Sequence, residues 1–422
     1  MSKLSYLEKL LDGVEVEWLP LWKVTIWDKK FNAVDRKKQP KVINYQYLLA
    51  AELFKLEQKN GDVFLLSTGE KTGWTNEVLA GSYLREGEVV TIPWGKSRPV
   101  KDVIKYYKGR FVTADNRIAT SNNTAVLLNK YLYYWMMHQS QLIDSYYRGS
   151  GIQHPSMVDV LDMLIPIPSV AIQSEIVRIL DKFTALTAEL TAELTTRKKQ
   201  YNYYRDRLLS FKEGEVEWKT LGDVTKKWYS GGTPTAGNPE YYVNGKIPWL
   251  RTQEVKFTDI SATDVKITEA ALKNSSAKWI PKNCVIIAIS GATAGRSAIN
   301  KIPLTTNQHC GCLEIDSKKA LYRYVFHWVS FNYESIKVLG QGARGDLNST
   351  IIKNFKLPIP YATNPEKSLQ EQAKIVAVLD KFDALTNSIS EGLPREIELR
   401  QKQYEYYRDL LFNFPKPKPV TN

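Results

Sequence analysis

The sequence contains few of the residues from which catalytic and metal sites are usually built. Its 422 residues include only 3 cysteines and 4 histidines. An odd and sparse set of cysteines argues against a disulfide scaffold and predicts a reducing, cytoplasmic location. No apolar run approaches the roughly 18 residues that a bilayer span needs, and the first residues show no apolar signal segment. We expect a cytoplasmic protein with no membrane partner.

The motifs of common nucleotide-dependent enzymes are also missing. Lys96 and Ser97 follow Gly95, but a phosphate-binding loop needs a glycine five positions before Gly95, where the chain has Val90. The glycine-rich turn and the Asn/Asp-Pro-Pro-aromatic motif of a DNA methyltransferase are absent. The sequence therefore predicts no catalytic residue on this chain.

Two weaker patterns leave alternatives open. Pro239-Glu240 followed by Glu254-Val255-Lys256 has the spacing of a nuclease site, but 45 acidic residues produce such patterns easily, and a solvated or recognition loop is favoured. Zinc is a second alternative, since its four ligands would be Cys284, His309, Cys310 and Cys312. No CxxC pair is present and the cysteines lie in apolar segments, so we expect buried cysteines and no metal site.

The composition that is present points to a folded protein with a polyanionic partner. A hydrophobic fraction of 43% with 11% aromatic residues excludes disorder as the main state. The chain carries 58 Lys+Arg against 45 Asp+Glu, a net charge of +13. Such an excess favours a nucleic acid or a membrane surface as partner, although a basic protein with no such partner stays possible. The length suggests two or three domains.

An internal duplication organises the chain. Residues 180–187 recur at 379–386 with seven identities in eight, and residues 197–211 recur at 400–414 with ten in fifteen. The Ile-Pro-Ile-Pro segment at 165–168 precedes the first set, as Leu-Pro-Ile-Pro at 357–360 precedes the second. This order cannot arise twice by chance, so the protein is a tandem repeat of about 200 residues.

The chain ends suggest that the repeat closes on itself. Residues 6–18 resemble residues 204–218 with a two-residue gap, so the chain begins inside the last turns of a repeat. Each unit has a globular part rich in Gly, Pro and Trp, followed by a long apolar stripe at three- and four-residue spacing, over about 170–211 and 368–412. The Pro-containing segments should stop any strand, and residues 392–394 (Gly-Leu-Pro) should kink the second helix.

These observations predict an α+β protein in a pseudo-twofold cyclic arrangement. Two mixed α/β domains are joined by two long helices that pair as an antiparallel coiled coil; the alternative packs each helix on its own domain. The predicted boundaries are domain 1 at 1–165, a central spacer helix at 166–213, domain 2 at 214–357, a C-terminal spacer helix at 358–414 and a Pro/Lys tail at 415–422.

Loops that combine glycine, hydroxyl, aromatic and basic residues recur in both domains. Arg and Lys suit guanine edges and phosphates, Asn and Gln suit adenine, and glycine permits close approach of the backbone. Two such sets in a basic, duplicated protein predict binding of double-stranded DNA. The candidate DNA-binding residues are Lys71, Thr72, Trp74, Trp94, Lys96, Ser97, Arg98, Asn116, Arg117, Arg148 and Gln153 in domain 1, and Ser230, Thr233, Trp249, Arg251, Ser290, Thr293, Arg296, Asn307, Gln308, Gln341 and Arg344 in domain 2.

The order of these segments resembles the DNA-specificity subunit of type I restriction–modification enzymes over essentially the whole chain. The tandem Thr-Ala-Glu-Leu at 187–194, the first residues and residues 391–411 resemble the branch of that family with such repeats in its central spacer. The resemblance implies two target-recognition domains that read the two halves of a split DNA target. It also implies two modification subunits, which hold S-adenosylmethionine and methylate adenine, and restriction subunits that use ATP and magnesium, with no cofactor on this chain.

The tandem repeat predicts how far apart the half-sites lie. Four residues add about 6 Å and turn a helix by about 40° beyond a full turn, while one base pair adds about 3.4 Å and about 34°. Because the grooves must face the domains, we expect each added copy to lengthen the gap by one base pair. Alternatively the repeat only stabilises the helix. Two other function classes stay open at this point, a self-sufficient nuclease or methyltransferase and a basic coiled-coil scaffold that binds all DNA alike.

Overall fold

The computed structural model describes residues 6–96, 98–212, 214–342, 345–388 and 391–415. Within these residues the chain divides into two compact units. Unit 1 contains residues 6–188 together with 399–415, and unit 2 contains residues 189–398. Each unit thus combines one repeat with a helical segment from the end of the other repeat. None of the described helices combines the length and the apolar character that a membrane span requires.

Unit 1 is built on a six-stranded sheet in the order β2-β7-β5-β6-β3-β4. All neighbours are antiparallel except β3 and β6. The strands are β2 (Thr25–Trp27), β3 (Val63–Leu66), β4 (Gly73–Thr75), β5 (Arg85–Pro93), β6 (Lys105–Thr113) and β7 (Asn116–Ser121). Apart from short 3-10 helices and the spacer helices, the other elements are α1 (Tyr6–Leu11), β1 (Glu17–Pro20), α2 (Leu21–Val24), α3 (Ala50–Leu53), α4 (Glu77–Ala80), α5 (Asn129–His138), α6 (Ser140–Ser145), β8 (Tyr147–Arg148), β9 (His154–Pro155), α7 (Met157–Asp162) and β10 (Leu164–Ile167).

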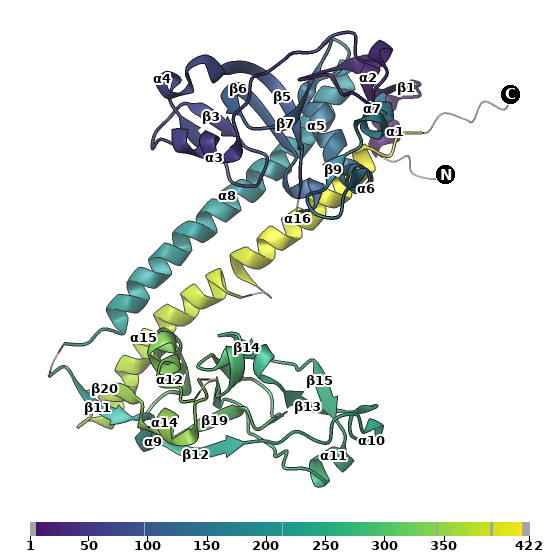
Figure 1. The fold of residues 1–422 in the computed structure, drawn as a ribbon. Coiled ribbons are helices and arrows are strands. Elements are labelled where there is room, and N and C mark those ends of the chain that lie inside the picture. Colours follow the sequence, from purple (N-terminus) through teal and green to yellow (C-terminus); the bar gives the residue numbers. More distant parts are fainter. Residues whose placement is uncertain (1–5, 97, 213, 343–344, 389–390, 416–422) are drawn as a thin grey trace. The chain divides into compact units, whose positions relative to one another are not determined.

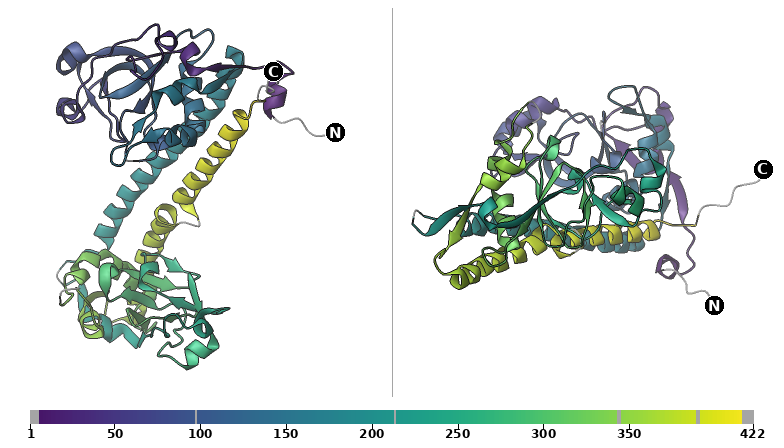
Figure 2. Two further views of the ribbon diagram at one scale, coloured as in Figure 1. Left: turned by 45° about the vertical axis from the view of Figure 1, so that its right-hand side comes forward. Right: turned by 90° about the horizontal axis from the view of Figure 1, so that it is seen from below.

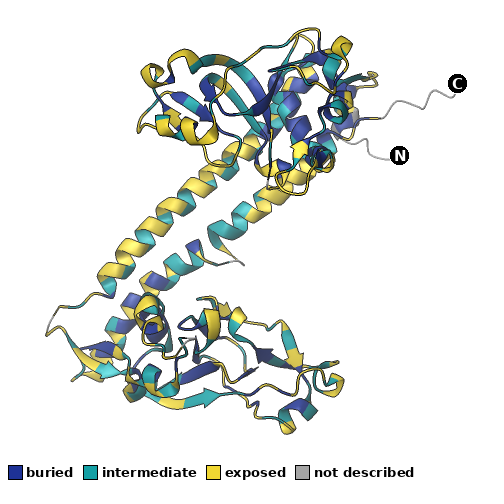
Figure 3. Ribbon diagram, in the orientation of Figure 1, coloured by how far each residue is buried: buried dark blue, intermediate teal, exposed yellow. Residues whose placement is uncertain are grey.

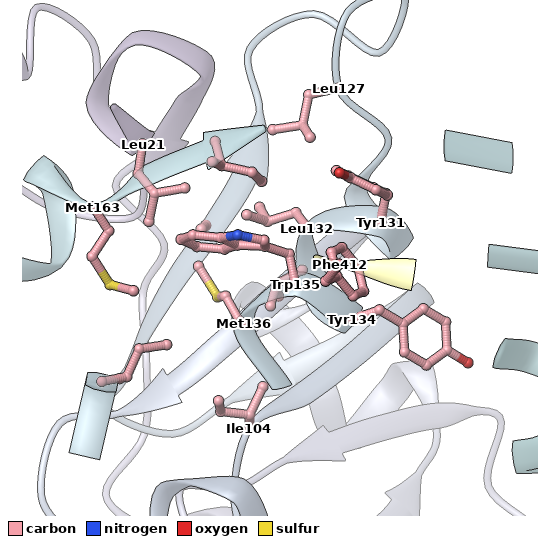
Figure 4. Close-up of a cluster of buried hydrophobic side chains, with 14 of the residues drawn as sticks. Leu21, Ile104, Leu127, Tyr131, Leu132, Tyr134, Trp135, Met136, Met163 and Phe412 are labelled. Atoms are coloured by element: carbon pink, nitrogen blue, oxygen red, sulfur yellow. The ribbon is translucent and has the colours of Figure 1, made fainter. Parts of the chain in front are cut away.

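The main core of unit 1 surrounds helix α5. Figure 4 shows Trp135 of this helix among Leu21, Leu132 and Met163, and only 2% of Trp135 is exposed. Phe412, near the C-terminal end of the chain, lies in the same cluster, with its ring 5.3 Å from that of Tyr131. The residues that follow α16 are therefore part of the first domain's core.

The two larger sheets of unit 2 have five strands in the order β12-β19-β16-β17-β14 and three strands in the order β15-β13-β18. These strands are β12 (Thr225–Ser230), β13 (Ile247–Leu250), β14 (Asp259–Ile260), β15 (Val265–Ile267), β16 (Val285–Ala288), β17 (Ser297–Asn300), β18 (Thr305–Thr306) and β19 (Cys310–Ile315). Around them lie β11 (Val216–Thr220), α9 (Leu221–Val224), α10 (Pro239–Tyr242), α11 (Glu269–Lys273), α12 (Tyr322–Phe331), α13 (Tyr333–Lys337), α14 (Ser349–Asn354) and β20 (Lys356–Pro360). Figure 3 shows the inner strands of this unit as its most buried part.

The Pro-containing segments form strands, so the prediction that they stop any strand is wrong. β1 pairs with β10, placing Trp18 opposite Pro166, and β11 pairs with β20, placing Trp218 opposite Pro358. Each pair is a separate two-stranded sheet. Proline is tolerated there because a strand with one neighbour leaves alternate N–H groups without a ladder partner. The central spacer helix consequently begins at Val170, after β10, and not at residue 166.

The central spacer is one continuous helix, α8 (Val170–Leu208), of 39 residues. The C-terminal spacer is instead two helices, α15 (Pro365–Thr386) and α16 (Gly392–Leu411). The predicted kink is a break between Thr386 and Gly392, and residues 392–394 form the start of α16. Gly392 has φ +76°, and a Cβ at this position would collide with the carbonyl oxygens of Ala384 and Leu385, so only glycine fits the turn.

In both units the two spacer segments lie side by side. In unit 1 the ring of Phe183 in α8 stacks on that of Tyr407 in α16, at 5.2 Å; Figure 2 shows the two helices adjacent there. In unit 2 the ring of Phe382 in α15 stacks on that of Tyr204 in α8, at 5.5 Å. Phe183 and Phe382 occupy the same position of the repeat, as do Tyr407 and Tyr204, so each unit uses the same contact with the repeats exchanged.

Candidate nucleic-acid interface

In unit 1 the predicted loops contact one another beside the six-stranded sheet. This region, the unit 1 loop edge, consists of residues 28–31, 67–72, 94–96, 98, 115–117 and 148–154. Lys96 and Gln153 exchange backbone hydrogen bonds of 3.0 and 3.3 Å, which ties the loop after β5 to the loop between β8 and β9. Nδ1 of His154 lies 2.9 Å from the carbonyl oxygen of Trp94, and the two rings are 4.6 Å apart.

Trp94 is an exposed aromatic residue of this edge that is held in place by its neighbours. The guanidinium carbon of Arg117 lies 3.8 Å from the Trp94 ring centroid, a cation–π contact that holds the indole in place. Arg117 itself donates to Oδ1 of Asp115 at 2.9 Å, and Lys29 donates to the same oxygen at 2.8 Å. Trp94 remains 36% exposed while Arg117 is buried. The pair therefore presents a fixed aromatic surface supported by a buried cation.

Other candidates in unit 1 hold the loops and do not project from them. Asn116 is 1% exposed, and its side-chain amide donates to the carbonyl oxygens of Leu66 and Ser67 at 2.9 and 3.3 Å. Lys96 is buried and bonds Asp144. Both side chains are already engaged within the protein, so the structure places them as supports of the loop edge.

The exposed cations of unit 1 lie around these supports. Lys71 pairs with Glu57 at 2.8 Å, and Arg148 pairs with Asp159 at 3.2 Å. Arg98 pairs with Glu70, which links two loops of the edge. Thr72 is exposed beside Lys71, and Trp74 on β4 is 45% exposed. Exposed pairs of this kind contribute little to stability, so these cations are available to phosphates.

In unit 2 the predicted loops also converge. The unit 2 loop edge consists of residues 230–234, 289–296, 305–309, 340–342 and 345–347. The Thr233 hydroxyl donates to Oε1 of Gln308 at 2.7 Å, and the Ser290 hydroxyl lies 2.6 Å from Nδ1 of His309. The N–H of Gly291 donates to Oδ1 of Asp346 at 3.3 Å, while Gln341 forms a backbone pair with Asp346. Four loops are thereby cross-linked by polar side chains.

The unit 2 candidates divide into buried, half-buried and exposed groups. Trp249 is 6% exposed and its Nε1 donates to the Gly232 carbonyl oxygen at 3.1 Å; Asn307 is also buried and accepts the N–H of His309 at 3.1 Å. Ser230, Arg251, Thr293 and Arg296 are half-buried, and Thr233, Gln308 and Gln341 are exposed. Ser97 and Arg344 lie outside the described residues.

One glycine of unit 2 is required by a contact within the protein. We expected glycines to let the backbone approach DNA. A Cβ at Gly231 would overlap the backbone of Thr306, so this glycine allows two loops of the protein to touch. The packing of these two loops helps to shape the unit 2 loop edge.

Several residues of the two alternative sites have structural roles. Glu254 accepts the backbone N–H groups of Arg251 and Asp264 at 3.1 and 2.8 Å, which leaves it holding a turn. Cys284 and Cys310 are buried in an apolar cluster, and this burial raises the pKa of each thiol to about 12. In the part of the chain that the structure describes, no three His, Cys, Asp or Glu residues are grouped as metal ligands.

Two segments of the chain, each the length of a domain, match the model of one protein family. The profile of the type I restriction modification DNA specificity domain matches residues 43–197 and again residues 213–399. The chain belongs to this specificity family. It is 43% identical to the specificity subunit of the type I restriction enzyme EcoR124I/EcoR124II of Escherichia coli, with 100% of both chains covered. It is 31% identical to a putative type I specificity subunit of Haemophilus influenzae, covering 97% of this chain and 98% of that one.

The fold agrees with that membership. The crystal structure of the S subunit of a type I restriction–modification system from M. genitalium superposes with a TM-score of 0.63 at 16% identity, covering 96% of this chain and 98% of that chain. Identity this low shows a shared fold alone. The shared fold extends over both units and the spacer helices of this chain.

Sequence reasoning missed several residues of the loop edges. Asp115, Lys29 and Asp346 bond the candidates, and His154 stacks on Trp94. Asp115 and His154 are neighbours in sequence of candidates already chosen, which was a usable signal. Lys29 and Asp346 meet their partners only through the folding of distant segments, and a single sequence contains no trace of those contacts.

A buried carboxyl within the unit 1 loop edge, that of Asp28, predicts a pH dependence of stability. Burial raises the pKa of Asp28 from 3.8 to about 6, against the lowering effects of the Ile118 N–H and the Lys29 and Arg117 charges. The folded state therefore binds this proton more tightly, and the stability it contributes is lost as the pH rises from about 4 through about 6. We expect Asp28→Asn to stabilise the protein near pH 7 by up to about 3 kcal/mol, measured by urea unfolding near pH 5 and pH 7. Asp12→Asn, an exposed carboxyl of the same unit, is the control, and equal pH slopes for the two variants would contradict the prediction.

Proposed function

We propose that this chain is the sequence-reading subunit of a type I restriction–modification complex, and that its two recognition domains bind the two halves of an asymmetric, interrupted DNA target. The observation that carries this proposal is the double match of one DNA-specificity domain, once on each unit. Specificity subunits are not themselves enzymes, which agrees with the lack of catalytic motifs in the sequence. The recognition domains are assigned to residues 1–165 and 214–357, and the loop edges are the proposed DNA-contacting surfaces.

The difference between the two loop edges supports an asymmetric target. The unit 1 loop edge presents Trp94 on a buried arginine, whereas the unit 2 loop edge presents hydroxyl, amide and imidazole groups such as Ser290, Gln308 and His309. Groups of such different chemistry favour different base edges. The two half-sites should therefore differ in sequence.

We further propose that the spacer segments form an antiparallel coiled coil with pseudo-twofold symmetry. The support is the reciprocal contact, Phe183 with Tyr407 in unit 1 and Phe382 with Tyr204 in unit 2. An exchange of this kind is what a twofold relation between the repeats produces. A helix of 39 residues is roughly 60 Å long. This length is sufficient for the two domains to contact major grooves that lie at least one DNA turn, about 34 Å, apart. Within it the tandem Thr-Ala-Glu-Leu is proposed to set the gap.

The proposed partners are two modification subunits, which would hold S-adenosylmethionine, and restriction subunits, which would use ATP and magnesium. Support for two equal docking surfaces comes from exposed residues that recur in the repeat. Tyr203 in unit 2 and Tyr406 in unit 1 are 59% and 65% exposed, and each is followed by the same Arg-Asp pair, with N–O distances of 2.7 and 2.8 Å. Tyr406 also lines a groove of about 1090 Å³ with Trp18 and His138. Large exposed aromatics of this type are frequent interface anchors.

We expect Tyr203→Ala or Tyr406→Ala to weaken the binding of one modification subunit about 30-fold each, as for a residue contributing about 2 kcal/mol at an interface. Each single variant should form a complex with one modification subunit, and the double variant should form none. Native mass spectrometry at fixed subunit concentrations measures this stoichiometry. Val78→Ala, an exposed apolar residue of unit 1 without a counterpart in the repeat, is the control. Two bound subunits on the double variant would show that the tyrosines are not the docking surface.

The proposed function is tested by footprinting the assembled complex on DNA in the presence of competitor duplex. A specificity subunit should protect two short segments separated by a gap, only when the cognate modification subunit is present, and competitor DNA without the target should not displace it. A self-sufficient nuclease or methyltransferase would instead act as the purified single chain. A non-specific scaffold would bind all duplexes alike with a salt-dependent affinity. Either result would refute the proposal.

A further inference from the structure

Each recognition domain is joined to its spacer helix by the same hydrogen bonds. In unit 1 the buried side chain of Gln173 accepts the N–H of Leu128 at 2.9 Å and donates to the Val126 carbonyl oxygen at 2.7 Å. These two residues lie just before helix α5. The side-chain amide of Gln173 therefore caps the loop that leads into that helix.

The equivalent residues of unit 2 repeat this arrangement. Gln372 of α15 accepts the N–H of Leu321 at 2.9 Å and donates to the Lys319 carbonyl oxygen at 3.4 Å, just before helix α12. Gln372 is fully buried, as is Gln173. The same device thus holds two loops whose surrounding sequences differ.

A carboxylate two turns further along each spacer makes the second contact. In unit 1 Asp181 accepts from Nζ of Lys130 at 2.8 Å and from the hydroxyl of Tyr134 at 2.6 Å. Lys130 and Tyr134 are four residues apart on α5, so they lie on one face of that helix. The carboxylate therefore fixes the rotation of α5 about its own axis.

In unit 2 the carboxylate is the same but its partners are different. Asp380 lies 2.6 Å from an amino nitrogen of Arg323 and 2.6 Å from Nε2 of His327, again four residues apart on α12. Burial opposes ionisation of Asp380, but the hydrogen bonds from His327 and Arg323 outweigh it and hold its pKa below the usual value. Lysine and tyrosine in one domain are thus replaced by arginine and histidine in the other.

The spacer helices contribute the same residue types, Gln and Asp, in both units. The residues that the domains contribute differ in chemistry between the units. We propose that Gln173 with Asp181, and Gln372 with Asp380, form two sockets that fix the angle of each recognition domain on its spacer, and that a domain fits a socket when its helix offers two hydrogen-bond donors at positions i and i+4. These four residues are positioning residues. The inference rests on the proposed function, because the angle matters only if the domains must face two half-sites at a set distance.

Directional bonds are needed here because the rest of the contact is apolar. In unit 1 Ile172, Ile176 and Leu180 of α8 pack in the same core as α5, and apolar burial holds surfaces together without a preferred direction. Without the carboxylate the domain should stay attached but vary in angle. Targets with the wrong gap would then be accepted more readily.

The test measures methylation of a target library in which the half-sites are constant and the gap varies, with the fully assembled complex. We expect Asp380→Asn to reduce the preference for the correct gap over gaps one base pair shorter or longer by roughly tenfold, since an error of about 1 Å in positioning costs on the order of 100-fold. The half-site sequences should not change. Asp380→Glu, which retains the charge, should restore much of the preference. Lys130→Met in unit 1 removes a donor to Asp181 and should reduce the gap preference in the same way. It keeps the inference testable if the Asp380 variant fails to fold.

Glu371→Gln is the matched control. It removes an exposed pair with Lys374, 2.9 Å long, on the same helix, and should leave gap preference unchanged. Variants that lose thermal stability but keep the full gap preference would show that the sockets are merely structural and overturn the inference. If the unmodified complex shows no gap preference at all, the proposed function fails first, which distinguishes the two failures.

Discussion

Insertion of a third Thr-Ala-Glu-Leu copy after Leu194 is expected to transfer methylation to targets whose gap is one base pair longer. The two present copies, residues 187–194, lie inside the uninterrupted helix α8. The inserted turn would add about 6 Å and about 40° of rotation, and the rotation matches the roughly 34° of one base pair. We expect methylation at the original gap to fall on the order of 100-fold, because both grooves can no longer face the domains together.

The structure supports this insertion as a tolerated change. None of residues 187–194 is fully buried, so another turn displaces no core residue. The C-terminal spacer is already interrupted between Thr386 and Gly392 and need not lengthen as one rigid helix. Figure 3 shows the middle of α8 as largely exposed.

The measurement is sequencing of methylated adenines after modification by the assembled complex. Insertion of Glu-Ala-Ala-Lys at the same place is the control, because it adds the same length with a different sequence and should give the same new gap. An unchanged gap with the third copy would refute the role of the repeat as a ruler and leave only helix stabilisation.

Exchange of the second recognition domain is expected to change one half-site and to leave the other intact. Replacing residues 214–357 with the corresponding domain of another specificity subunit should abolish methylation of the old half-site. A few mismatched base pairs, at about 1–3 kcal/mol each, amount to roughly a thousandfold loss or more. The unit 1 loop edge shares no residue with the exchanged segment, so its half-site should persist.

The structure indicates better junctions for this domain exchange than the sequence boundaries do. A junction at residue 357 cuts through β20, which pairs with β11. Exchange of residues 221–355 leaves that two-stranded sheet intact, and the 2.8 Å hydrogen bond from the Leu221 N–H to the Phe355 carbonyl oxygen travels with the domain. Methylated-adenine sequencing reads both half-sites at once. The control exchanges residues 221–355 for the same segment of a relative with the same target, and a change in both half-sites would mean that the domains do not read independently.

Much of the architecture was predictable because it repeats. Seven identities in eight around Asp181 and Asp380, and ten in fifteen around Tyr203 and Tyr406, defined two spacers and two variable domains. Periodic apolar residues located α8 to within a few residues. The strands at Pro166 and Pro358 were missed, since proline excludes a central strand but not a strand with one neighbour.

The candidate site was predictable as a set of loops and not as a set of side chains. Trp94, Gln308 and Gln341 are exposed as expected, whereas Asn116 and Trp249 are buried. Residue type alone could not separate these groups. Asparagine and tryptophan can donate a hydrogen bond to a neighbouring loop of the protein as well as to DNA. Whether their polar atoms face solvent or another carbonyl depends on segments about 50 residues away for Asn116, which bonds Leu66.

By itself the sequence determined the duplication, the positive charge, the two helical spacers and the family resemblance, because each of these is written in residues adjacent along the chain. Only the tertiary structure decided which loops share an edge, which candidates are supports, and how Gln173, Asp181, Gln372 and Asp380 hold the domains. The physical reason is that hydrogen bonds and burial link residues far apart in sequence. Lys130 and Asp181 are 51 positions apart, and no local pattern encodes their meeting.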